Sequence, residues 1–99
     1  MSPAPYRTTP VFGQDTLPDA IRTEHRTKER TWGLLRVLEG SATLVFIEPP
    51  RETPVDADSP GQIPPQDSHF VRLNGPVRLQ IEFYREPPLT GGDRSTQRN

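Results

Sequence analysis

Two histidines are the side chains of this sequence best suited to bind a metal ion or to move a proton. His25 and His69 are the only imidazoles in the chain, which has no cysteine, so a metal site would use nitrogen and oxygen ligands. In the run 69–73, His69 shares one face with Val71 and Leu73, which predicts that its ring points inward. Two histidines and one carboxylate can hold Zn, Fe, Mn or Ni, so a divalent metal is a candidate cofactor.

Glu82 is the candidate third ligand. It lies in an alternating run on the side opposite the apolar residues, where an outward salt bridge is the favoured alternative, with Arg36, Arg78 or Arg85 as partner. Glu24 and Glu29 are nearer to His25 in sequence, but a segment so rich in charge is usually solvated. Each histidine also has a simpler interpretation, in which its ring bonds a backbone carbonyl or an acid.

The segment 22–30 and two aromatic residues have two interpretations each. The segment combines basic and acidic side chains around His25, so it is either a cationic mouth for an oxyanion or, as we favour, a solvated stretch of mixed charge. Trp32 and Tyr84 are either walls of a ligand pocket or, as we favour, packing residues of the core or of a dimer.

Composition excludes several classes of function. Twelve basic residues against thirteen acidic ones, with a pI near 6.1, give no field that would recruit nucleic acid or an anionic membrane. No run approaches the roughly 18 apolar residues of a membrane span, and no secretory signal is visible, which predicts a soluble, cytoplasmic protein. A hydrolytic serine is excluded because Ser68 and His69 are adjacent and would face opposite sides of a strand.

Short strands must position these residues. Thr16 is the expected cap of a helix within 15–22, and alternating apolar runs predict strands over 32–38, 42–47, 69–73 and 77–84. The turns Glu39-Gly40-Ser41 and Asn74-Gly75 predict that the first two and the last two strands form hairpins. This pattern favours a small barrel or jelly roll over an immunoglobulin-like sandwich, since Trp32 lacks a flanking cysteine pair.

Several motifs in this order resemble the TehB/YeaR-like domain family, small cupin-like proteins associated with tellurite resistance. They are Tyr6-Arg7-Thr8-Thr9-Pro10-Val11-Phe12, His25-Arg26-Thr27-Lys28, Thr31-Trp32-Gly33, Val37-Leu38-Glu39-Gly40, Pro65 with His69, and Glu82-Phe83-Tyr84-Arg85.

The resemblance implies an all-β fold of the cupin type, a double-stranded β-helix or jelly-roll barrel, with one short N-terminal helix. It implies one domain over 6–85, flanked by flexible tails at 1–5 and 86–99, commonly paired as a homodimer with a metal-capable pocket. The spacing from Pro64 to His69 fits a cupin motif, whereas Gly33 stands where the cupin glutamate is expected.

The first functional hypothesis is a small cupin-like protein that binds a divalent metal or a small oxyanion in its barrel through His25, His69 and Glu82. The resemblance adds a role in tellurite resistance or stress. The alternatives are a metal-dependent oxygenase or isomerase, with a small molecule as ligand, and a structural barrel with an empty interior. Some TehB proteins are longer and carry a methyltransferase, which we do not expect here because the chain lacks a Gly-rich nucleotide-binding turn.

Overall fold

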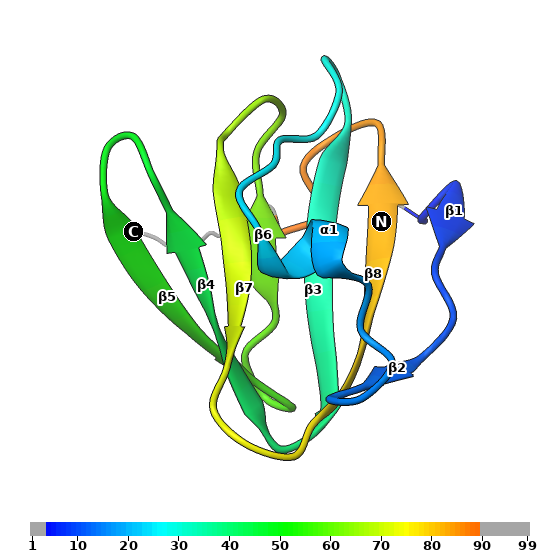
Figure 1. Cartoon of the computed structure of the whole chain (residues 1–99). Coiled ribbons are helices and arrows are strands. Elements are labelled where there is room, and N and C mark those ends of the chain that lie inside the picture. Colours follow the sequence, from blue (N-terminus) through cyan, green and yellow to red (C-terminus); the bar gives the residue numbers. More distant parts are fainter. Residues whose placement is uncertain (1–3, 90–99) are drawn as a thin grey trace.

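The computed structural model describes residues 4–89, which fold mainly into antiparallel β-strands (Figure 1). In chain order the elements are β1 (Arg7–Thr8), β2 (Phe12–Gly13), α1 (Asp19–Arg22), β3 (Trp32–Glu39), β4 (Ser41–Phe46), β5 (Arg51–Asp56), β6 (Gly61–Ile63), β7 (His69–Leu73) and β8 (Arg78–Tyr84). The prediction of a mostly β chain with one short N-terminal helix is therefore confirmed.

The strands form two sheets. In the first, β8 pairs with β3 on one edge and with both β1 and β2 on the other, and β6 lies outside β3. In the second, β4 lies between β5 and β7. Neighbouring strands are antiparallel throughout.

Both predicted hairpins are wrong, although their turns are real. β3 and β4 follow each other through Gly40, but they belong to different sheets, and the same is true of β7 and β8. Gly40 has a φ of +80°, and a side chain there would collide with the carbonyl oxygen of Pro76, so the turn needs glycine. Local turn residues predicted a reversal of the chain correctly, but pairing is decided by which faces are buried.

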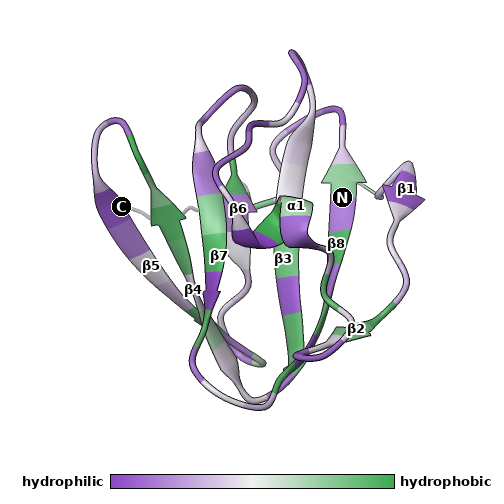
Figure 2. Ribbon diagram, viewed as in Figure 1, coloured by the Kyte–Doolittle hydropathy of each residue, from purple (hydrophilic) through white to green (hydrophobic). Residues whose placement is uncertain are grey.

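The core lies between the two sheets. β8 shows the predicted alternation, since Leu79 and Ile81 are buried while Arg78 is exposed. Apolar and polar bands also alternate along β3 (Figure 2). The buried cluster is built from both sheets: Leu35, Val37, Ile63, Leu79 and Ile81 from the first, and Ala42, Leu44, Phe46, Val55 and Val71 from the second.

The sheets do not close into a barrel within residues 4–89. β5 has a hydrogen-bonded ladder only with β4, so it forms one edge of its sheet, and Pro54 in that strand is tolerated because an edge strand need not offer every N–H. The finer prediction of a cupin double-stranded β-helix is accordingly not confirmed; the coarser description, two small antiparallel sheets around one core, holds.

The helix is shorter than predicted. It covers only the single turn Asp19–Arg22, preceded by Pro18 at the cap position without a side-chain cap bond. The predicted cap residue, Thr16, instead accepts a hydrogen bond from the backbone N–H of Gly13 at 2.8 Å. Among residues 4–89 no helix has the length and apolar character to cross a membrane.

The predicted tails fall mostly outside the described residues, which begin at 4 and end at 89. Of the C-terminal tail, residues 86–89 are described, and the backbone N–H of Leu89 donates to Gln62 Oε1 at 2.7 Å. Gln62 belongs to β6, so Leu89 lies beside that strand.

Candidate functional site

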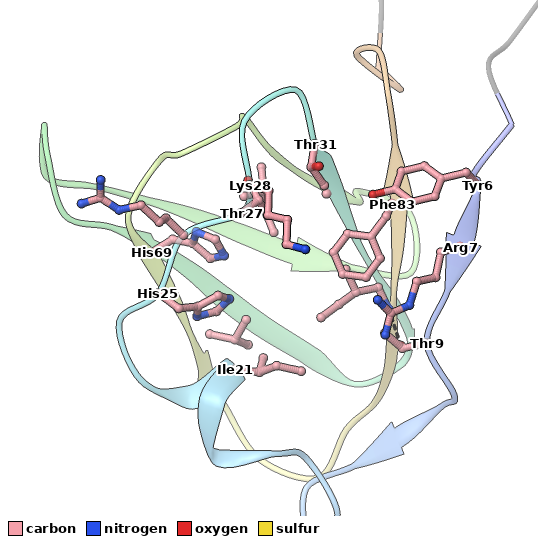
Figure 3. A pocket seen from close by; sticks show the side chains of 15 residues that line it. Tyr6, Arg7, Thr9, Ile21, His25, Thr27, Lys28, Thr31, His69 and Phe83 are labelled. Atoms are coloured by element: carbon pink, nitrogen blue, oxygen red, sulfur yellow. Dashed lines mark hydrogen bonds between the residues drawn. The ribbon is translucent and has the colours of Figure 1, made fainter.

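A pocket of about 260 Å³ lies between the two sheets, beside the segment 23–31 that joins α1 to β3 (Figure 3). Its apolar lining comes from α1 and four strands: Ile21, Gly33, Ile63, Val71, Ile81 and Phe83. Its polar lining comes chiefly from the N-terminal residues Tyr6, Arg7 and Thr9 and from the segment 25–31, with His69. A partly apolar hollow with a few polar groups is the usual form of a small-molecule site.

His25 and His69 meet at this pocket, as predicted from an inward-facing His69. Their main chains form an isolated antiparallel bridge, in which His25 N–H donates to the His69 carbonyl at 2.9 Å and His69 N–H donates to the His25 carbonyl at 2.8 Å. Their ring centres are 4.2 Å apart, with the ring planes inclined at 58°. His69 is 1% exposed, whereas His25 is half-buried.

Each ring uses Nδ1 to bond a nearby backbone carbonyl. His69 Nδ1 lies 2.6 Å from the carbonyl oxygen of Asp67, and His25 Nδ1 lies 3.0 Å from that of Thr23. A carbonyl oxygen only accepts, so Nδ1 carries the proton in both rings. In a neutral ring Nε2 is then an acceptor.

Burial determines the charge of His69. Desolvation is the largest influence and lowers its pKa below the ordinary value. The bond to the Asp67 carbonyl comes next and raises the pKa, and the neighbouring His25 then lowers it. His69 is therefore neutral at pH 7.

Three positive residues line the pocket, and none of its lining within residues 4–89 is a carboxylate. Arg7 comes from β1, and Arg26 and Lys28 come from the segment 23–31. Figure 3 shows the Lys28 side chain extended into the pocket. Arg26 donates to the Ser68 hydroxyl at 3.0 Å, and the Arg7 guanidinium lies 5.6 Å from the centre of the Phe83 ring. The charged side chains of the segment 22–30 are all exposed, as expected of the solvated stretch of mixed charge that we favoured, although Arg26 and Lys28 also border the pocket.

Comparison with known proteins identifies the family. The sequence profile described as TehB-like domain matches residues 7–81. The chain belongs to the TehB-like domain family. No curated protein matches the chain significantly.

Two solved structures resemble this TehB-like domain. TehB from Haemophilus influenzae is 28% identical, with a TM-score of 0.74 over 84% of this chain, which spans 31% of that longer chain. A protein from Escherichia coli strain K12 is 19% identical, with a TM-score of 0.75, over 84% of this chain and 90% of its own. At that identity the second likeness shows the fold alone.

The predicted function, a cupin that binds metal or a small oxyanion, is wrong, and so is the alternative of a metal-dependent cupin enzyme. The family that matches is the TehB-like domain family, which does not support a metal-binding cupin. Within residues 4–89 no group of three or more His, Asp or Glu side chains is arranged to hold a metal ion. His25 and His69 lie together, but among residues 4–89 no carboxylate lines the pocket with them.

Glu82 lies away from the histidines. It accepts a hydrogen bond from Arg36 Nε at 2.9 Å and another from the Tyr84 hydroxyl at 2.7 Å, so the favoured alternative of a salt bridge with Arg36 is confirmed. This interaction raises the pKa of Arg36, while burial and then the bond to Glu82 raise the pKa of Tyr84. Neither Tyr84 nor Trp32 lines the pocket of the TehB-like domain.

The N-terminal wall of the pocket was not predicted from the sequence. Tyr6, Arg7 and Thr9 line it because β1 pairs with the end of β8, with Arg7 opposite Phe83. The family motif over 6–12 marks this stretch, but the alternation of Arg7 and Thr9 with their neighbours is too short to assign a strand.

Proposed function

We propose that this TehB-like domain binds a small organic acid, a carboxylate carried on an apolar body, in the pocket between its sheets. The observation that carries this proposal is the composition of the lining: Arg7, Arg26 and Lys28 belong to a hollow with apolar walls to which residues 4–89 contribute no carboxylate. A lone inorganic ion would not contact the apolar walls, whereas an organic acid would contact the cations with its carboxylate and the apolar walls with its body.

The pocket lining is positively charged, although the chain as a whole is slightly negative. The whole sequence has a formal net charge of −1, yet three cations gather at one hollow. The ion pairs found among residues 4–89 involve other arginines, namely Arg36, Arg51 and Arg72. All three cations are exposed, and a bound carboxylate would accept charge-assisted hydrogen bonds from them.

The size of the pocket limits the ligand. A volume of about 260 Å³ corresponds to on the order of nine water molecules, which is less than most drug-sized ligands occupy. A single aromatic ring with a short acid chain has the right dimensions. Tellurite resistance, the role associated with TehB, is the setting in which we propose that such a binding domain acts.

Lys28 makes the proposal directly testable because it is the only lysine in the sequence. Reductive ¹³C-methylation labels Lys28 and the N-terminal amine and keeps their charge. Benzoate, phenylacetate and 3-phenylpropanoate are titrated in the presence of EDTA, each against its neutral amide. We expect saturable shifts of the Lys28 methyl signal with the acids and about tenfold weaker binding of the amides.

Variants provide the controls. Arg7→Gln should weaken acid binding by about tenfold. Arg72→Gln is the matched control, because Arg72 pairs with Glu52 at an exposed position outside the pocket. The proposal fails if none of the acids shifts the Lys28 signal at about 10 mM, or if acids and amides bind equally.

A further inference from the structure

The two histidines offer the pocket one particular chemical function. Both Nδ1 atoms are used by carbonyl oxygens, that of Asp67 for His69 and that of Thr23 for His25. Nε2 lies on the opposite side of each ring, and among residues 4–89 it has no hydrogen-bond partner. For His69 this leaves a ring nitrogen without a partner in a residue that is 1% exposed and lines the pocket.

A buried polar atom without a partner is unfavourable, and most such atoms in proteins bond to something. Here the protein supplies none for His69 Nε2, while the ring itself borders the hollow. A neutral ring with its proton on Nδ1 presents Nε2 as an acceptor. The missing partner must therefore be a donor, an O–H or N–H group that enters the pocket.

We infer that His25 and His69 form an acceptor subsite for a hydroxyl group, so that the ligand of this pocket is a hydroxy acid with an apolar body. This inference rests on the proposed function, since it takes the acid group to lie with the cations. It adds the second polar group of the ligand and the residues that select it.

The arrangement of the pocket suits a ligand that has a polar group at each end. Figure 3 shows His25 and His69 side by side on one wall, with Arg7 and Phe83 on the opposite side and the Lys28 side chain extending between them. Apolar side chains of Ile63, Val71 and Ile81 complete the lining. A ligand whose hydroxyl meets the histidines and whose carboxylate meets the cations would place its apolar body against these side chains.

Matched acids test the inference. Phenylacetate is compared with 3-hydroxyphenylacetate and 4-hydroxyphenylacetate, and with the methyl ether of each hydroxy acid, by calorimetry at pH 7.5. We expect one of the hydroxy acids to bind about tenfold more tightly than phenylacetate, because it satisfies the buried acceptor. The methyl ether should lose this advantage, since it keeps the oxygen but lacks the donor hydrogen.

Nitrogen NMR gives a second measurement, which reads the protonation of each ring nitrogen directly. The sequence has only two histidines, so a ¹⁵N–¹H spectrum of the imidazoles contains two spin systems, which His25→Ala assigns. In the free protein His69 should show a protonated Nδ1 and an unprotonated Nε2, and the Nε2 signal should shift when the hydroxy acid binds. His25→Ala should reduce the preference for the hydroxy acid over phenylacetate, whereas Arg72→Gln, outside the pocket, should leave that preference unchanged.

The outcomes separate the two claims. If phenylacetate binds and neither hydroxy acid binds more tightly, the acceptor subsite is wrong while the organic-acid site stands. A free protein in which His69 carries its proton on Nε2 also overturns the subsite. If no acid binds, both proposals fail together.

Discussion

His25 and His69 are joined by their main chains, each donating its N–H to the carbonyl of the other at 2.9 and 2.8 Å. Their rings are therefore neighbours, with centres 4.2 Å apart, because the backbone bridge holds the two residues together. The bridge also fastens the segment 23–31 to β7 at one side of the pocket.

The first prediction concerns this bridge. His25→Pro removes the N–H that donates to His69, whereas His25→Ala removes only the ring. We expect His25→Pro to lower the free energy of unfolding by about 1–3 kcal/mol more than His25→Ala. Hydrogen exchange should also show faster exchange in the segment 23–31 of the proline variant, and equal exchange in both variants would mean that the bridge contributes nothing.

The second prediction is a loss of stability at acid pH caused by His69. Its pKa in the folded protein is below the ordinary value of 6.5, so the unfolded chain binds the proton more readily. The stabilisation is complete above about pH 6.5 and is lost as the pH falls below that value. Thermal unfolding measured between pH 7.5 and 5.5 should show a smaller decline in His69→Gln than in the parent protein, with His25→Gln as the comparison; unchanged slopes would exclude His69 as the cause.

The third prediction concerns Glu82. Its partner Arg36 is 44% exposed at the side chain, so solvent screening limits the value of the pair. Glu82→Gln should therefore cost no more than about 1 kcal/mol of stability in urea unfolding. Because Glu82 does not line the pocket, acid binding should be unchanged in this variant, and a loss of binding would show that Glu82 belongs to the site.

The fourth prediction concerns the turn between the sheets. Gly40→Ala should lower the free energy of unfolding by about 2 kcal/mol or more, since it combines a positive φ with a collision against Pro76. Gly75→Ala is the matched control: its φ is also positive, at 146°, but no atom lies within 4 Å of the added carbon. Equal losses at both glycines would mean that the collision relaxes at no cost.

The strands could be predicted from the sequence because their alternation is local. Leu79 and Ile81 are buried and Arg78 is exposed as the pattern of β8 predicts. The pairing of the strands could not be predicted from the sequence. The turns at Gly40 and Asn74-Gly75 are compatible both with a hairpin and with a chain that passes from one sheet to the other. A turn fixes the direction of the chain, but which neighbour a strand finds depends on contacts distant in sequence.

The site was predictable in part. The inward orientation of His69 could be predicted because it shares a strand face with Val71 and Leu73. The position of Glu82 on the opposite face from Leu79 and Ile81 followed from the alternation of side chains along the strand. The contribution of Arg7 could not be predicted, since it depends on the register that sets Arg7 opposite Phe83, 76 positions later in the chain. The metal hypothesis failed because two histidines brought together do not by themselves supply a carboxylate.

The outer strand of the smaller sheet also bears on how copies of this chain can meet. β5 is the edge strand of its sheet. It contains Pro54, which has no N–H to donate, and the charged residues Arg51, Glu52 and Asp56. A strand from another molecule would find few continuous backbone partners there and would have to desolvate those charges. Sheet extension at this rim is therefore disfavoured, which protects the domain from fibre-like stacking and directs any self-association to a different surface.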